Sequence, residues 1–178
     1  MGALMKIVFS GFGGQGVLTL GQIVASIAMN QGKHVTWMPA YGAEMRGGTA
    51  NCTVIISDKI IGSPIANENI DILCAMNIPS VLKFYDKVIP NGHAFINSSI
   101  INTPKERNDI TLTEIDATNI ATKIGNPKVA NMVMIAAFLK NTTLFTMKDV
   151  TEMLHQKFSK KYPTLIPLNI QAIEAGLV

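Results

Sequence analysis

The chain has 178 residues, of which 48% are apolar and 15% are charged, and its formal net charge is +3. This length suits one domain with a well-formed core, so we expect a single domain over residues 1–178. The charges are spread along the chain without a basic stripe, which argues against nucleic acid as a partner. The sequence shows neither a membrane-spanning apolar run nor a signal-peptide pattern, so we expect a cytoplasmic protein without membrane contact.

The first elements predict a strand, a glycine turn, a helix and a second strand. Residues 5–10 form a short apolar run that reads as a buried strand. Apolar residues then recur at helical spacing after Gly16, and Asn30 and Gly32 supply a stop signal for that helix. Residues 34–39 form the next strand, closed by a proline. This order predicts a βαβ unit with two parallel, neighbouring strands.

The rest of the chain predicts a hairpin, further strands and a helical C-terminal part. A polar loop over residues 40–50 leads into a strand over 51–57, which a tight turn joins to a strand over 60–65. Further strands are expected over 70–76, 94–100 and 110–117, with a turn at 91–93, and helices over 79–89, 116–125, 127–141, 146–159 and 166–177. The sequence therefore predicts an α/β fold: one three-layer domain with a mainly parallel sheet, an inserted β-hairpin and helices on both faces.

The turn after the first strand has the pattern of a nucleotide-binding loop. Gly11, Gly13 and Gly16 fit G-x-G-x-x-G between a strand and a helix, and Gly14 and Gln15 complete the loop. A dinucleotide site also needs an acidic residue at the end of the second strand, and the sequence there offers none. Three hypotheses remain open: a tight structural turn, a phosphate site for another cofactor, or a contact with another subunit.

A second motif, YGAEMRGG, spans residues 41–48. Its residues of interest are Tyr41, Gly42, Glu44, Arg46, Gly47 and Gly48. The planar guanidinium of Arg46 suits a carboxylate or a phosphate. A surface loop with a local Glu44–Arg46 ion pair and a binding loop are both compatible with this sequence.

Taken together, three segments resemble the gamma subunit of the 2-oxoacid:ferredoxin oxidoreductases. They are GFGGQGVLTLGQIVASIAM, YGAEMRGGTANCTVIIS and IGSPIANENIDILCAMNIPSVLKF. The resemblance is strong over residues 6–100 and looser through GNPKVANMVMIAAFLK and NIQAIEAG. The form EMRGGTANC is similar to subunits that act on 2-oxoglutarate or on branched-chain 2-oxoacids such as 2-oxoisovalerate.

The resemblance implies a role in a multi-subunit enzyme that is not catalytic as an isolated chain. In this family a 2-oxoacid and coenzyme A (CoA) give acyl-CoA, CO2 and reduced ferredoxin. The complex is expected to use thiamine diphosphate, Mg2+ and iron–sulfur clusters, and the partners to be thiamine-binding alpha and beta subunits and a ferredoxin-like delta subunit. This chain has two cysteines, Cys52 and Cys74, which are too few for a cluster. We therefore expect it to bind none of these cofactors alone.

What remains for this chain is positioning, and we expect no catalytic residue and no metal ligand in it. Gly11, Gly13, Gly14, Gln15 and Gly16 are candidates for binding CoA or a phosphate, and the second motif is a candidate interface or substrate-channel loop. One hypothesis is that both motifs cap a CoA or substrate channel. A competing hypothesis is that they only dock onto partner subunits. A third alternative is an independent nucleotide- or phosphate-binding α/β protein.

Overall fold

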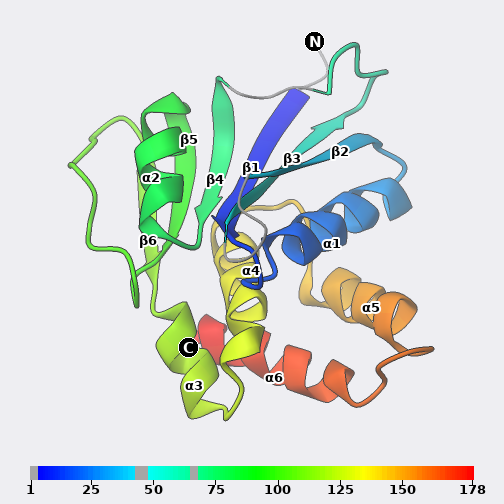
Figure 1. Cartoon of the computed structure of the whole chain (residues 1–178). Coiled ribbons are helices and arrows are strands. Elements are labelled where there is room, and N and C mark those ends of the chain that lie inside the picture. Colours follow the sequence, from blue (N-terminus) through cyan, green and yellow to red (C-terminus); the bar gives the residue numbers. More distant parts are fainter. Residues whose placement is uncertain (1–3, 43–47, 65–67) are drawn as a thin grey trace.

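A computed structural model describes residues 4–42, 48–64 and 68–178 of the chain (Figure 1). Six strands form one sheet in the order β2-β3-β1-β4-β5-β6. They are β1 (Leu4–Phe12), β2 (His34–Tyr41), β3 (Thr49–Ser57), β4 (Ile70–Ala75), β5 (Val88–Asn97) and β6 (Thr111–Ile115). β1, β4, β5 and β6 are parallel neighbours, whereas β3 is antiparallel to both β1 and β2. The expected α/β fold with a mainly parallel sheet and a hairpin is confirmed.

Two details of the predicted topology are wrong. β2 does not lie beside β1, because β3 is inserted between them. The hairpin pairs β2 with β3, from His34 opposite Ser57 to Tyr41 opposite Ala50, and residues 60–64 form no strand. Gly62 and Pro64 weaken that segment as a strand, whereas β2 carries its Pro39 at the sheet edge, where a missing N–H group costs no ladder bond.

The helices cover both faces of the sheet and complete three layers. They are α1 (Val17–Asn30), α2 (Ile78–Phe84), α3 (Ala117–Lys123), α4 (Ala130–Asn141), α5 (Met147–Phe158) and α6 (Leu165–Leu177), with short 3-10 helices η1 (Tyr85–Lys87) and η2 (Pro127–Val129). Successive residues of β1 point to opposite faces, so Ile7 and Phe9 pack in the larger core with α1, α4, α5 and α6. Val8 packs in the smaller core under α2.

The helix expected over residues 79–89 and the turn expected at residues 91–93 also need correction. The helix expected over residues 79–89 ends at Phe84, and η1 leads directly into β5. The turn expected at residues 91–93 lies inside β5, where the pairing register with β4 shifts and Asn91 has a φ of +64°. A local backbone irregularity within a continuous strand thus replaces the predicted turn.

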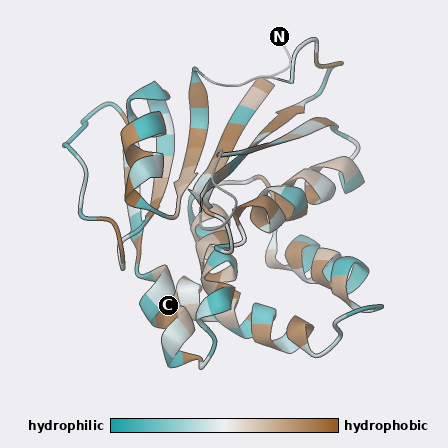
Figure 2. Cartoon of the chain, viewed as in Figure 1, coloured by the Kyte–Doolittle hydropathy of each residue, from teal (hydrophilic) through white to brown (hydrophobic). Residues whose placement is uncertain are grey.

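The larger core is built around α4. Figure 2 shows mostly hydrophobic residues along the central strands, while α5 carries many hydrophilic ones. Phe138 of α4 is fully buried, and its ring lies 5.6 Å from that of Phe9 and 4.9 Å from that of Phe95. The helix expected over residues 146–159 is confirmed as α5, and Thr146 and Asp149 form a capping box at its start. Within the described ranges, the helices are too short or too polar to cross a bilayer.

Candidate functional site

The glycine loop joins the carboxyl end of β1 to α1 and is closed by the side chain of Gln15. The Gln15 Oε1 atom accepts a hydrogen bond from the Phe12 N–H group at 2.7 Å, and its Nε2 atom donates to the Met76 carbonyl oxygen at 3.1 Å. As a candidate for binding CoA, a phosphate or another subunit, Gln15 is expected to present its amide outside the loop. The structure instead places both of its polar atoms in bonds that tie β1 to the segment after β4.

Two glycines of the loop are required by close packing. A Cβ atom on Gly11 would lie 2.8 Å from Val17 Cγ1 and 2.9 Å from Met76 Cβ. Gly16 has a φ of +74°, and a Cβ atom there would overlap the side chain of Asn131 in α4. The Asn131 Nδ2 atom donates to the Gly16 carbonyl oxygen at 3.2 Å, so the start of α1 is fixed against α4.

Gly13 and Gly14, in contrast, face open space. A Cβ atom on Gly13 would meet only the Gly48 carbonyl oxygen, at 3.6 Å, and one on Gly14 would meet nothing within 4 Å. Among the described residues, the N–H groups of Gly14 and Gly16 have no hydrogen-bond acceptor. α1 also lacks a side-chain cap, so its first N–H groups stay available to an acceptor outside the loop.

The structure brings the two sequence motifs together. The Gly13 N–H group donates to the Gly48 carbonyl oxygen at 2.8 Å, directly beyond the pairing of Phe12 with Thr49. Gly42 closes the other side, since its N–H group donates to the Thr49 carbonyl oxygen at 2.6 Å. Motif residues 30 or more positions apart in sequence therefore form one edge of the domain.

The remaining residues of the second motif are only partly placed. Tyr41 ends β2 with 72% of its surface exposed. Glu44, Arg46 and Gly47 lie outside the described residues, so the predicted Glu44–Arg46 pair stays a prediction. The described part of the motif nevertheless lies at the carboxyl end of β1. Parallel α/β proteins bind ligands at this end of their strands.

A hollow of about 210 Å3 lies beside the glycine loop. It is lined by Gly14, Gln15, Ile100, Thr118 and Lys128, together with Met76, Pro127 and Ala130. Sequence reasoning missed Thr118 and Lys128, which belong to the starts of α3 and η2. The signal for Thr118 was its position directly after the last predicted strand, because helices that follow parallel strands begin at the same sheet edge. Lys128 follows a helix and gave no such signal. Lys128 contributes a positively charged residue to the lining of this hollow.

The two cysteines lie in strands on either side of β1 and are fully buried. Burial raises the pKa of the Cys52 thiol to about 12 and also raises the pKa of the Cys74 thiol. Both groups are therefore protonated thiols at neutral pH and poor metal ligands. In the described part of the chain, no three His, Cys, Asp or Glu side chains are grouped to hold a metal ion.

Three comparisons place this chain among known proteins. It is 35% identical over 173 residues to the ketoisovalerate oxidoreductase subunit VorA of Methanothermobacter thermautotrophicus, with 97% of this chain and 35% of VorA covered. It is 32% identical over 148 residues to the 2-oxoglutarate synthase subunit KorC of Methanocaldococcus jannaschii, with 82% of this chain and 79% of KorC covered. The chain thus spans about a third of the length of VorA.

The fold and the family agree with these relatives. The structure of a keto/oxoacid ferredoxin oxidoreductase gamma subunit from Geobacter sulfurreducens matches with a TM-score of 0.79 and 26% identity, covering 97% of this chain and 96% of that one. The family model described as pyruvate ferredoxin/flavodoxin oxidoreductase matches residues 6–178. The chain therefore belongs to the pyruvate ferredoxin/flavodoxin oxidoreductase family.

Proposed function

We propose that the chain is the gamma component of a 2-oxoacid:ferredoxin oxidoreductase. Its similarity to VorA and KorC supports 2-oxoisovalerate or 2-oxoglutarate as the substrate of the complex. The complex would convert the 2-oxoacid and CoA to acyl-CoA and CO2, with ferredoxin as the electron acceptor. This function is favoured over an independent nucleotide-binding protein, because residues 36–41 at the end of β2 include no acidic residue of the kind a dinucleotide site has there.

The carbon–carbon bond cleavage and the electron transfer belong to partner subunits in this proposal. A cluster needs a set of cysteine thiolates, and the two buried, protonated thiols of this chain do not fit that need. Thiamine diphosphate and Mg2+ are accordingly assigned to alpha and beta subunits, and the clusters to a ferredoxin-like delta subunit. The gamma component contributes assembly and contacts to the CoA or substrate channel.

The hydrogen bond between Gly13 and Gly48 carries the proposal for the site. It unites both motifs into one surface at the carboxyl end of β1. That surface offers N–H groups at the start of a 14-residue helix, and Lys128 lines the hollow beside Gly14 of the same loop. These groups suit a phosphate or carboxylate group, so the surface would cap the CoA or substrate channel of the assembled enzyme.

The test is the variant Gly13→Asp in the assembled complex. A side chain at this position has space, so the fold is expected to hold while a carboxylate is placed beside the proposed anion site. Gly62→Asp is the matched control, because Gly62 also has open space around it. We expect Gly13→Asp to raise the KM for CoA several-fold and Gly62→Asp to leave it unchanged. An unchanged KM in an intact Gly13→Asp complex would refute the channel contact.

A second candidate function for the same surface is docking without a ligand. The exposed aromatic ring of Tyr41 at the end of β2 favours it, since exposed aromatic side chains are common anchors of protein interfaces. Copurification of Tyr41→Ala and Arg46→Ala variants with the partner subunits separates the two functions. Lost association with an intact fold supports docking, whereas intact association with reduced turnover supports a ligand contact.

A further inference from the structure

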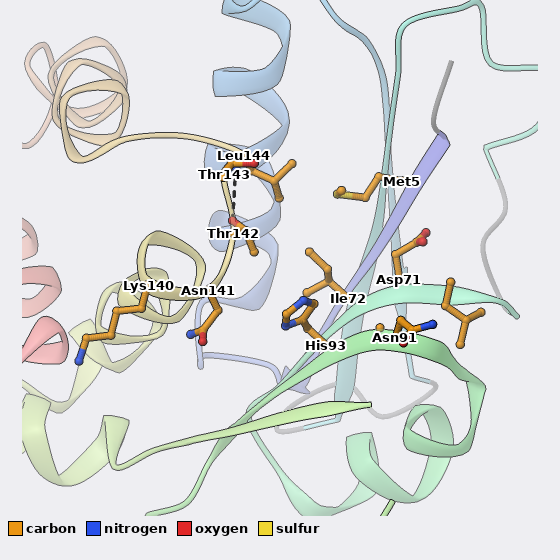
Figure 3. A pocket seen from close by; sticks show the side chains of 12 residues that line it. Met5, Asp71, Ile72, Asn91, His93, Lys140, Asn141, Thr142, Thr143 and Leu144 are labelled. Carbon is orange, nitrogen blue, oxygen red and sulfur yellow. Dashed lines mark hydrogen bonds between the residues drawn. The ribbon is translucent and has the colours of Figure 1, made fainter. Parts of the chain in front are cut away.

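A second hollow, of about 540 Å3, lies at the amino-terminal ends of the parallel strands (Figure 3). Met5 of β1, Ile72 of β4 and His93 of β5 line one side, and the segment after α4 lines the other. The strand length between Met5 and the glycine loop is about 25 Å, so this hollow is separate from the proposed channel surface. Its volume is in the range of small-molecule sites, about 300–1,000 Å3.

The backbone next to this hollow is irregular in a way that positions His93. The register of β4 and β5 shifts between Ile70 and Ile72, which marks a bulge. Asn91 holds a left-handed φ of +64°. Gly92 is packed so closely that a Cβ atom would lie 2.8 Å from the Ile89 carbonyl oxygen. Bulges and such strained conformations are frequent at functional sites, because they redirect side chains. Figure 3 shows the His93 ring facing the hollow.

The end of α4 presents hydrogen-bond acceptors to the hollow. The Nδ2 atom of Asn141 already donates to the Ala137 carbonyl oxygen at 2.8 Å, which leaves its Oδ1 atom. The hydroxyl of Thr142 donates to the Phe138 carbonyl oxygen at 2.8 Å and accepts a hydrogen bond from the Leu144 N–H group at 3.4 Å, which leaves one lone pair on its oxygen. Both residues line the hollow at the carboxyl end of α4, where the last carbonyl groups carry partial negative charge.

The charged side chains around the hollow also favour a ligand that donates hydrogen bonds. Asp71 lines it, and its Oδ2 atom accepts a hydrogen bond from the Lys6 N–H group at 2.7 Å. Lys140 also lines it, but its amino group extends away from His93 and Thr142 (Figure 3). The remaining lining includes the carbon surfaces of Met5, Ile72 and Leu144. A ligand here meets the acceptors at the end of α4 on one side and the carbon surfaces of Met5 and Ile72 on the other.

We propose that this hollow binds a small organic amine in its ammonium form. The ammonium group lies beside the Oδ1 atom of Asn141, the remaining lone pair of the Thr142 hydroxyl and the negative end of α4. The hydrocarbon part packs against Met5, Ile72 and Leu144. His93 forms the floor of the site next to the amine. This site is independent of the proposed oxidoreductase function and would remain if that function were disproved.

The test uses n-butylammonium as the probe and the full chain in solution. The imidazole NMR resonances of His93 report on the hollow, and those of the exposed His34 and His155 serve as internal references. Butyrate and n-butanol have the same carbon chain with a negative and a neutral head group. We expect a saturable shift of His93 alone with n-butylammonium, and binding at least five-fold weaker for the other two probes. Equal or tighter binding of butyrate, or equal shifts of all three histidines, would overturn the proposal.

Substitutions at the end of α4 give a directional check. Asn141→Asp replaces the free amide oxygen by a carboxylate, so we expect three- to ten-fold tighter binding of n-butylammonium. Asn141→Lys places a positive charge there and is expected to abolish binding. Asn102→Asp is the control for net charge, because Asn102 lies in the loop that follows the carboxyl end of β5. Unchanged or weaker binding by a folded Asn141→Asp variant refutes the assigned ligand chemistry.

Discussion

Replacing Gly16 by alanine tests how the glycine loop is fixed against α4. Gly16 has a φ of +74°, and its carbonyl oxygen accepts a hydrogen bond from the 6%-exposed Asn131 side chain. A new Cβ atom would overlap the Asn131 side chain. The change therefore adds backbone strain, displaces a buried amide and breaks its hydrogen bond.

Gly32 allows the backbone strain to be measured separately. Its φ of +78° is nearly that of Gly16, but a Cβ atom on Gly32 would meet nothing within 4 Å. Gly32→Ala is expected to cost about 1–2 kcal/mol of stability through the left-handed backbone alone. Gly16→Ala should cost roughly 1.5–4.5 kcal/mol more, from overpacking of about 1–3 kcal/mol and a lost hydrogen bond of about 0.5–1.5 kcal/mol.

The assay is urea unfolding of the full chain, followed by circular dichroism and repeated as a thermal melt. For a chain of this size the excess corresponds to a melting temperature lower by roughly 3–18 °C than that of Gly32→Ala, since 1 kcal/mol shifts it by about 2–4 °C. The double variant Gly16→Ala with Asn131→Ala should recover part of the loss, because the overlap is gone. Equal stability of the Gly16→Ala and Gly32→Ala variants would refute the packing argument.

Three further predictions concern stability, pH and thiol reactivity. Arg107→Ala removes bonds to two backbone carbonyls and to a carboxylate, so we expect a loss of about 1.5–3 kcal/mol in urea unfolding. The hydrogen bond from the Thr146 backbone holds the pKa of Asp149 below its usual 3.8, so this capping contribution is present above pH 4 and is lost as pH falls further. Asp149→Asn should therefore flatten the decline of stability below pH 4. Cys52 and Cys74 should not react with a thiol reagent at pH 8 until the chain unfolds, because both are fully buried.

Each of these has an outcome that contradicts it. Wild-type stability of Arg107→Ala would mean that the bonds from Arg107 to the carbonyl groups of Tyr85 and Val88 contribute nothing to holding the segment that follows β5. An acid profile of Asp149→Asn identical to that of the wild type would remove the capping box as a source of the pH dependence. Rapid labelling of either cysteine in the folded chain would contradict its burial.

The sequence determined the features that depend on local spacing. The strand before the glycines, the helix after them and the helix over residues 146–159 were predicted correctly, because each depends on residues close together in the chain. The glycine loop and the YGAEMRGG motif were also recognisable by their residues alone. The sequence could not show that the Gln15 amide is hydrogen-bonded within the domain, because its Nε2 atom donates to the carbonyl oxygen of Met76, 61 residues further along the chain.

Only the tertiary structure decided which strands are neighbours and which motifs meet. β3 lies between β1 and β2 in the sheet, and its pairing with β1 brings Gly48 next to Gly13. The apolar pattern of a strand fixes which of its faces is buried, but several partners can bury that face equally well. Strand order is then chosen by the packing of the whole sheet against its helices, which involves residues far apart in sequence. The amine site at the opposite edge arises from the same long-range packing, because it needs β5, β4 and the end of α4 together.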